Sequence, residues 1–348
     1  MKALKYLNKY FLKYKYRLLI GLFITFCSKY LALQIPQLIS KSLDASQDYK
    51  NGLITDLTAV KADLLNNILL IIGAALLSGF FTFIMRQTII VTSRLIEFDL
   101  KNEIYQQYQR LSLNFYKKNK TGDLMNRISE DVSKVRMYFG PAVMYFLNML
   151  VLFILAILKM YTIDPVLTLY TILPLPILSV SIYILSSIIH KRSTIVQQYL
   201  SKLTANAQEI FSGISIIKSY SVENKAIIEF DQLSNEAKEK NIHLYKANAL
   251  FHPLMMLLIG LSNILVIYIG GLRYMEGHIS LGVIAEFIMY VNMLTWPVAV
   301  VGWVTSIIQE AEASQNRINE FLKIEPEITN NNPEDSIIEG SIEFRNVT

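Results

Sequence analysis

The sequence predicts an all-α membrane protein in which six long transmembrane helices extend into the cytoplasm. Hydrophobic residues make up 53% of its 348 positions, and the mean hydropathy is positive. The apolar residues are gathered into long runs, and the loops between these runs alternate between short loops and two charged segments of about 50 residues. A soluble core of this length rarely contains so many apolar runs with so few charges.

Six apolar runs are long enough to cross a bilayer. Each has about 20 residues or more, and a helix of that length spans the ~30 Å hydrocarbon core. The first run is too long for a signal-peptide core and is not followed by a small-residue cleavage site, so we expect it to be retained as a helix. The runs cover residues 18–40, 64–88, 137–160, 165–189, 249–274 and 281–308.

The distribution of Lys and Arg orients these helices. The N-terminal tail, the two long charged segments and the C-terminal tail hold 27 of the 33 basic residues, whereas the opposite side holds five and Lys29 lies within the first run. The positive-inside rule assigns the richer side, with both termini, to the cytoplasm. The basic residues are not gathered on one soluble module, so we expect no nucleic-acid partner.

Cysteine and histidine usage excludes two kinds of site. Cys27 is the only cysteine and lies inside the first run, so a disulfide within the chain is impossible. We expect no metal site, because the four histidines are scattered over loops and span ends without metal-ligand spacing. The histidines are His190, His243, His252 and His278.

The first long charged segment has the pattern of a helical hairpin. Residues 94–109 keep apolar residues at helical spacing without a helix breaker, so the second span is expected to continue roughly 30 Å beyond the membrane as one rod. Residues 111–120 form a polar interruption, after which Thr121 is expected to cap a new helix. Three pairs at i,i+4 spacing favour that helix: Asp123 with Arg127, Arg127 with Asp131, and Glu130 with Lys134.

The second segment repeats this plan. Residues 191–208 are helical in pattern, Gly213 is the flexible point of a turn, and residues 223–246 return to the fifth run. Two hairpins of similar length are expected to place their tips side by side, about 30 Å below the membrane. Exposed aromatic residues at both tips favour the docking of a partner over simple solvated turns. These aromatic residues are Phe115, Tyr116, Phe211 and Tyr220.

Four motifs in order resemble the transmembrane half of an ATP-binding-cassette (ABC) exporter of the type IV, multidrug kind. Residues 113–132, which contain the run TGDLMNRISEDV, resemble the first coupling segment of that family. Residues 208–230 (QEIFSGISIIKSYSVENKAIIEF) resemble the second, and residues 281–297 resemble the last transmembrane helix. The later Gly302-Trp303, Gln309, Ala313-Ser314 and Arg317-Ile318 are similar to those of multidrug-type half-transporters.

The resemblance implies a homo- or heterodimer of two half-transporters whose coupling tips dock on cytoplasmic nucleotide-binding domains, the second tip on the domain of the partner. ATP-driven closure of those domains would rock the helix bundles from an inward-facing to an outward-facing form. ATP and Mg²⁺ are expected on those domains, and this chain is expected to hold no cofactor and no catalytic residue. The implied coupling residues are Asn114, Phe115, Tyr116, Lys117, Phe211, Ser212, Gly213 and Ile214.

The sequence divides into a transmembrane domain (1–324), a polar linker (325–340) and a short segment (341–348) that alternates apolar and polar residues. That segment resembles the first strand of a nucleotide-binding domain. The 348 residues contain no G-x-x-x-x-G-K-[ST] loop, so the chain alone is not expected to hydrolyse ATP. We interpret it as a half-transporter truncated at the start of its ATPase domain; a natural subunit served by a separate ATPase chain is the alternative.

Three polar residues within the apolar runs are candidates for a cavity or gate. Lys29 either neutralises an acidic substrate or takes a structural role by snorkelling or pairing. Glu286 either lines an outer gate or pairs locally, and Asn292 either contacts substrate or hydrogen-bonds between helices. Pro174 and Pro176 are expected to kink the fourth span, and Pro297 the sixth.

The resulting functional hypothesis is the membrane domain of an ATP-driven exporter of amphipathic compounds (drugs, lipids or peptides) in a bacterial plasma membrane. One alternative is an ion-coupled secondary transporter, a class that usually shows helices broken at mid-membrane and several buried acids. The other is a membrane-anchored scaffold that binds a soluble protein through the two tips.

Overall fold

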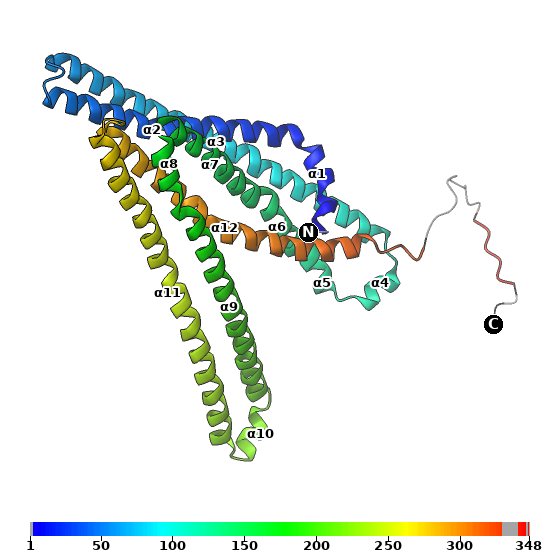
Figure 1. The fold of residues 1–348 in the computed structure, drawn as a ribbon. Helices are drawn as coiled ribbons and strands as arrows, with labels where there is room; N and C mark the ends of the chain where they lie inside the picture. The colour runs from blue at the N-terminus through cyan, green and yellow to red at the C-terminus, as the bar shows by residue number, and fades with distance from the viewer. Residues whose placement is uncertain (1–2, 329–339, 346, 348) are drawn as a thin grey trace.

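The computed structural model describes residues 3–328, 340–345 and 347, and these residues form helices and connecting loops without a strand (Figure 1). Six helical stretches are long and apolar enough to cross a membrane, which confirms the six predicted spans. Each stretch is longer than a bilayer requires. They cover Lys15–Lys50, Leu57–Arg110, Thr121–Ile163, Pro165–Ser212, Glu223–Met275 and Leu281–Leu322.

The first two spans, α2 (Lys15–Lys50) and α3 (Leu57–Arg110), pack along one another as an antiparallel pair (Figure 1). α3 runs for 54 residues without a break, which confirms that the second span continues as one rod. Small residues let the two backbones approach closely. A Cβ atom at Gly21 would lie 2.9 Å from the Ile89 side chain, and Ser28 Oγ lies 2.8 Å from Thr82 Oγ1.

A short N-terminal segment, η1 (Ala3–Leu7) and α1 (Asn8–Lys13), packs against the C-terminal part of α3 and against the last helix. It contributes three side chains to a buried cluster in which the rings of Phe139 and Phe321 are also enclosed. These three are Leu4, Leu7 and Tyr10.

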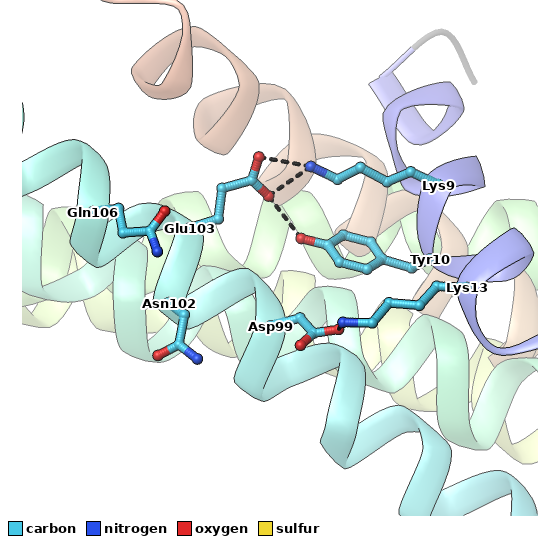
Figure 2. Close-up of a pocket in the computed structure, with 7 residues that line it drawn as sticks. All are labelled: Lys9, Tyr10, Lys13, Asp99, Asn102, Glu103 and Gln106. Carbon is cyan, nitrogen blue, oxygen red and sulfur yellow. Dashed lines mark hydrogen bonds and ion pairs between the residues drawn. The ribbon is translucent and has the colours of Figure 1, made fainter.

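Ion pairs fix the same segment to α3 (Figure 2). Lys9 Nζ lies 2.6 Å from Glu103 Oε1, and the Tyr10 hydroxyl donates to Glu103 Oε2 at 2.7 Å. One turn away, Lys13 Nζ lies 2.6 Å from Asp99 Oδ2. Burial, together with the Glu103 carboxylate, raises the pKa of Tyr10 well above its ordinary value, so this phenol remains a donor at physiological pH.

The third span is one helical stretch interrupted by two π turns. It comprises α5 (Thr121–Asn126), η2 (Arg127–Asp131), α6 (Val132–Met137), η3 (Tyr138–Ala142) and α7 (Val143–Ile163). Pro141 lies inside η3, where the wider turn accommodates its missing N–H.

The expected capping role of Thr121 is wrong. Lys120 occupies the N-cap position of α5, and no side-chain hydrogen bond caps this end. The reason is geometric: a cap residue must precede the helix in extended conformation, and Thr121 is already its first helical residue.

The fourth span is divided at Leu173 into α8 (Pro165–Ile172) and α9 (Pro174–Ser212), which confirms the predicted kink at Pro174. By contrast, α12 (Leu281–Leu322) continues through Pro297 without a break in its assignment. At the opposite end of α8, Asp164 accepts hydrogen bonds from Leu167 N at 2.8 Å and from Arg273 Nη2 at 2.6 Å.

The two long helical hairpins diverge (Figure 1). α3 leads to α4 (Leu113–Lys118), which lies near the end of α12, whereas α9 and α11 (Glu223–Met275) form a separate arm that ends in α10 (Ile214–Ser219). The expectation that the two tips lie side by side is therefore wrong. Helix length determines how far each tip reaches, but the packing at the opposite end of each hairpin determines its direction.

Candidate functional site: two hairpin tips and a membrane cavity

The first tip, α4 with its flanking residues, is fastened to the segment that follows α12. Ser112 Oγ and Asn114 Nδ2 each donate to the Glu327 carboxylate at 2.9 Å. Gln107 Nε2 donates to the Ile324 carbonyl at 2.6 Å. The first two bonds tie Glu327, near the start of the predicted linker, to the first tip, and the third ties the residue before the linker to α3.

The side chains of the first tip point in different directions. Phe115 is partly buried and packs against Phe321, with 6.1 Å between the ring centroids, so the expectation that its ring is exposed is wrong. Tyr116 is at the border of exposure and donates to the Tyr108 carbonyl. The outward-facing apolar residue is Leu113, which is 70% exposed, and Lys117 is exposed beside it.

The second tip presents apolar side chains directly to the surroundings. Gly213 separates α9 from α10, as its predicted role in the turn requires. Phe211 and Tyr220 are 74% and 76% exposed, respectively, and Ser212 and Ile214 are also exposed. This tip therefore has the surface that a docking element needs.

The arm that bears the second tip has no core of its own. α9 and α11 contact each other along its length, yet none of residues 183–246 is buried. Near the tip, a groove of about 370 Å³ lies between the two helices. Its lining is largely apolar and includes Ile210, Phe211, Ile227 and Phe230.

Behind the first tip, an ion pair connects η2 to α12. Arg317 Nε donates to Asp131 Oδ2 at 3.0 Å, and a second bond joins Arg317 Nη2 to Asp131 Oδ1. Two of the three predicted i,i+4 pairs, Asp123 with Arg127 and Glu130 with Lys134, are confirmed. The third, Arg127 with Asp131, is wrong because Asp131 faces α12.

A cavity of about 390 Å³ opens among α2, α3, α7 and α12 at membrane depth. Lys29, one of the predicted cavity residues, lines it. Further polar groups in the lining come from Thr82, Arg86, Tyr145 and Asn148, of which Asn148 donates to the Met144 carbonyl at 2.8 Å. Arg86 was not predicted as a cavity residue, because it was counted with the loop that follows the second span; its i,i+4 spacing from Thr82 is the signal that places both on one face of α3.

The other two predicted gate residues lie elsewhere on α12. Glu286 is only 3% exposed and accepts a hydrogen bond from the Tyr290 hydroxyl at 2.7 Å. That hydroxyl also lies 3.1 Å from the Leu33 carbonyl of α2. Asn292 is exposed on the surface of the chain and does not line the cavity that contains Lys29.

The N-terminal end of α12 is fixed to α2 by a carboxylate. Asp44 accepts from Gly282 N at 2.7 Å and from Ser280 Oγ at 2.6 Å, so it caps the first turn of α12. Gly282 is required there, since a Cβ atom would overlap the Ser40 carbonyl oxygen and lie 2.7 Å from Ser40 Oγ.

The C-terminal segment forms no strand over residues 340–345 and 347. A strand needs a neighbouring strand to pair with, so the predicted first strand of a nucleotide-binding domain stays a prediction. Most of the predicted linker at 325–340 lies outside the described residues.

Within the described part of the chain, no three His, Cys, Asp or Glu side chains form a cluster that could hold a metal ion.

Comparison with known proteins agrees with this geometry. Residues 18–298 match the family model of the ABC transporter transmembrane region. The chain is 30% identical over 323 residues to the multidrug resistance-like ATP-binding protein MdlA of Buchnera aphidicola subsp. Baizongia pistaciae, covering 92% of this chain and 54% of that protein. It is 28% identical over 245 residues to MdlA of Escherichia coli, covering 70% of this chain and 42% of that protein.

A Bacillus subtilis relative, the probable multidrug resistance ABC transporter ATP-binding/permease protein YheI, is 29% identical over 258 residues, with 74% of this chain and 44% of that protein covered. The chain thus spans about half the length of the curated relatives it matches. The family match covers most of the first span, the next four spans completely and the start of the sixth, and it includes both long hairpins and all but one residue of the cavity lining. The chain is an integral membrane protein and belongs to the ABC transporter transmembrane family.

Proposed function

We propose that this chain forms the translocation path of an ATP-driven exporter of amphipathic compounds in a bacterial plasma membrane, with both termini in the cytoplasm. It works as a dimer of two such halves and is driven by nucleotide-binding domains that supply ATP and Mg²⁺ chemistry. The observation that supports this most directly is the apolar second tip at the end of the α9–α11 arm.

The arm favours a second half-transporter as partner. A hairpin of two helices buries too little surface to hold its position alone, because most helical stability in proteins comes from tertiary packing. The arm leaves apolar side chains such as Ile195, Leu200 and Ile242 exposed along its length. A second copy, or a homologous subunit, would cover this surface.

The tips favour cytoplasmic ATPase domains as the other partner. Both tips lie on the side to which the basic residues assign the cytoplasm, and the segment after α12 is hydrogen-bonded to the first tip through Glu327. The relatives are named as ATP-binding or ATP-binding/permease proteins and are about twice as long as this chain. We infer that each tip passes the movement of an ATPase domain to the helices as a rigid lever.

The experiment is reconstitution of the complete gene product into proteoliposomes. We expect ATP hydrolysis that amphipathic compounds stimulate, and accumulation of those compounds inside inside-out vesicles only when hydrolysable ATP is present. Accumulation driven by an ion gradient without ATP would contradict the proposal in favour of a secondary transporter. Absence of both hydrolysis and transport in folded, dimeric protein would contradict it in favour of a scaffold.

A further inference from the structure

Two cations line the membrane cavity, and no acid accompanies them. Lys29 enters from α2 and Arg86 from α3, whereas the remaining lining comes from α7, α12 and small or apolar residues of α2 and α3. The lining contains no Asp or Glu. Within the described part of the chain, neither cation forms a hydrogen bond or an ion pair.

The acids nearest to the cavity residues along α2, α3 and α12 are engaged elsewhere. On α12, Glu286 accepts from Tyr290, and on α2, Asp44 caps the first turn of α12. On the cytoplasmic part of α3, Glu97 pairs with Arg94 and Lys101. The positive charge of the cavity is therefore not neutralised by the protein in this form.

A structural explanation by snorkelling does not fit Lys29. Its Cα lies 11 residues into the first predicted span, which corresponds to about 16 Å along the helix axis. A snorkelling lysine directs its amine to the membrane surface along the lipid-facing side of its helix. Lys29 instead lines a cavity shared by four helices, so its charge is held within the protein at a cost that a bound counter-ion would offset.

The rest of the lining suits an apolar body of variable shape. The ring of Tyr145 is held edge-on against Trp303, with 5.4 Å between centroids, and forms one wall. Methionine side chains are flexible and polarisable, and they adapt to differently shaped apolar ligands. Four methionines line this cavity: Met85, Met144, Met149 and Met293.

We propose that this cavity binds hydrophobic organic anions: Lys29 and Arg86 receive a carboxylate, sulfonate or phosphate group, and the methionine-lined part receives the apolar body. This assignment depends on the proposed export function and specifies the substrate class of that path. The volume of about 390 Å³ in one chain is within the range of small-molecule sites, and a second half-transporter would extend it.

The test compares three fluorescent probes that share one body: 11-dansylaminoundecanoate, its methyl ester and its trimethylammonium analogue. Each is titrated into the complete gene product in phosphatidylcholine nanodiscs without nucleotide, and its transport is measured in proteoliposomes with ATP. We expect the carboxylate to bind about ten- to hundredfold more tightly than the ester, the effect of a charge-assisted hydrogen bond, and the trimethylammonium probe to bind most weakly.

Substitutions assign the preference to the cavity. Lys29→Met and Arg86→Met should each remove most of the preference for the carboxylate while leaving the affinity for the ester within about twofold; the retained ester binding also shows that the variant is folded. Lys29→Arg should restore the preference. Lys41→Met, the same change at an exposed position of α2 outside the cavity, should have no effect.

The outcomes separate this inference from the proposed function. If the ester or the trimethylammonium probe is transported with ATP and the carboxylate has no advantage, the inference is wrong and the export function stands. A carboxylate preference that survives both Met substitutions also overturns the assignment to this cavity. If no probe of any charge is bound or transported and ATP hydrolysis is not stimulated, the export function itself fails.

The anion could be a membrane lipid or a soluble compound, and one added arm distinguishes them. Titration is repeated in nanodiscs that contain phosphatidylglycerol. If phosphatidylglycerol weakens binding of the carboxylate probe to the parent protein but not to Lys29→Met, the lipid competes for the cavity, and the occupant is an anionic lipid. If phosphatidylglycerol leaves binding of the carboxylate probe unchanged, the occupant is a soluble amphiphilic anion. Either result supports the inference.

Discussion

Arg317 of α12 donates from Nε to the Asp131 carboxylate of η2 at 3.0 Å, and this pair connects the last helix to the third span directly behind the first tip. Asp131 is 4% exposed, so its charge depends on the guanidinium for compensation. The pair therefore holds together the two elements that would transmit force from the first tip.

Arg317→Ala is expected to destabilise the protein by about 1–3 kcal/mol, because it leaves a buried carboxylate without its partner. The measurement is the thermal unfolding of the detergent-purified protein. Lys134→Ala removes an exposed i,i+4 pair with Glu130 and should change stability by less than about 0.5 kcal/mol. Equal changes in the unfolding temperature of the two variants would show that Asp131 tolerates the loss of Arg317.

Phe211→Ala is expected to lower the transport obtained per ATP hydrolysed several-fold without lowering thermal stability, because this ring is exposed at the second tip. Transport and hydrolysis are measured on the same proteoliposomes. Phe98→Ala, at an exposed aromatic of α3 away from either tip, should leave the ratio unchanged. If Phe211→Ala leaves the ratio of transport to ATP hydrolysis unchanged, Phe211 does not contribute to the coupling surface.

Phe115→Ala and Leu113→Ala are expected to differ in kind. The Phe115 ring packs on Phe321, so its removal should cost about 1–2 kcal/mol of stability, less than for a fully buried ring. Leu113 is outward-facing, so its removal should impair coupling while the unfolding temperature is retained. If Leu113→Ala destabilises more than Phe115→Ala, the orientation described for α4 is incorrect.

The contact between Glu327 and the first tip should depend on pH. Hydrogen bonds from Ser112 and Asn114 lower the pKa of Glu327 below its ordinary value. Since the folded carboxylate takes up its proton less readily than the unfolded one, the contact is complete above the ordinary glutamate pKa and is lost as the pH falls through the lowered value.

Hydrogen exchange of residues 321–328, corrected for intrinsic rates, should therefore increase on acidification. Glu327→Gln should raise exchange already at neutral pH. Glu325→Gln, at an exposed neighbouring position, is the matched control. Exchange in Glu327→Gln equal to that of the parent protein at neutral pH would show that the carboxylate does not hold this segment.

Gly282→Ala is expected to destabilise the outer end of the bundle by about 1–3 kcal/mol, because the added methyl group overlaps the Ser40 carbonyl and backbone atoms yield less easily than side chains. Gly271→Ala, where a Cβ atom has no neighbour within 4 Å, should be neutral or slightly stabilising by helix propensity. Unfolding temperatures of the two variants provide the comparison, and equal values would contradict the close approach of α12 to α2.

The secondary structure and the order of the membrane spans were largely predictable from the sequence. Apolar runs of bilayer length predicted six spans, uninterrupted helical spacing predicted that α3 continues into the cytoplasm, and Pro174 and Gly213 marked two of the breaks. All of these follow from local rules, namely the length, period and breakers of a helix. The candidate site was harder to predict from the sequence, because Phe115 and Phe211 have the same side chain but opposite exposure.

By itself, the sequence determined which segments are helical and which of them are long and apolar enough to cross the membrane, because hydrophobicity and periodicity act locally along the chain. Its charge bias predicts that the long hairpins lie in the cytoplasm. Only the tertiary structure decided that the hairpins diverge, that Asp131 turns from Arg127 to Arg317, and that Arg86 shares a cavity with Lys29. These outcomes depend on how helices distant in sequence pack against each other, and a side chain's neighbours across that packing are not encoded in its local spacing.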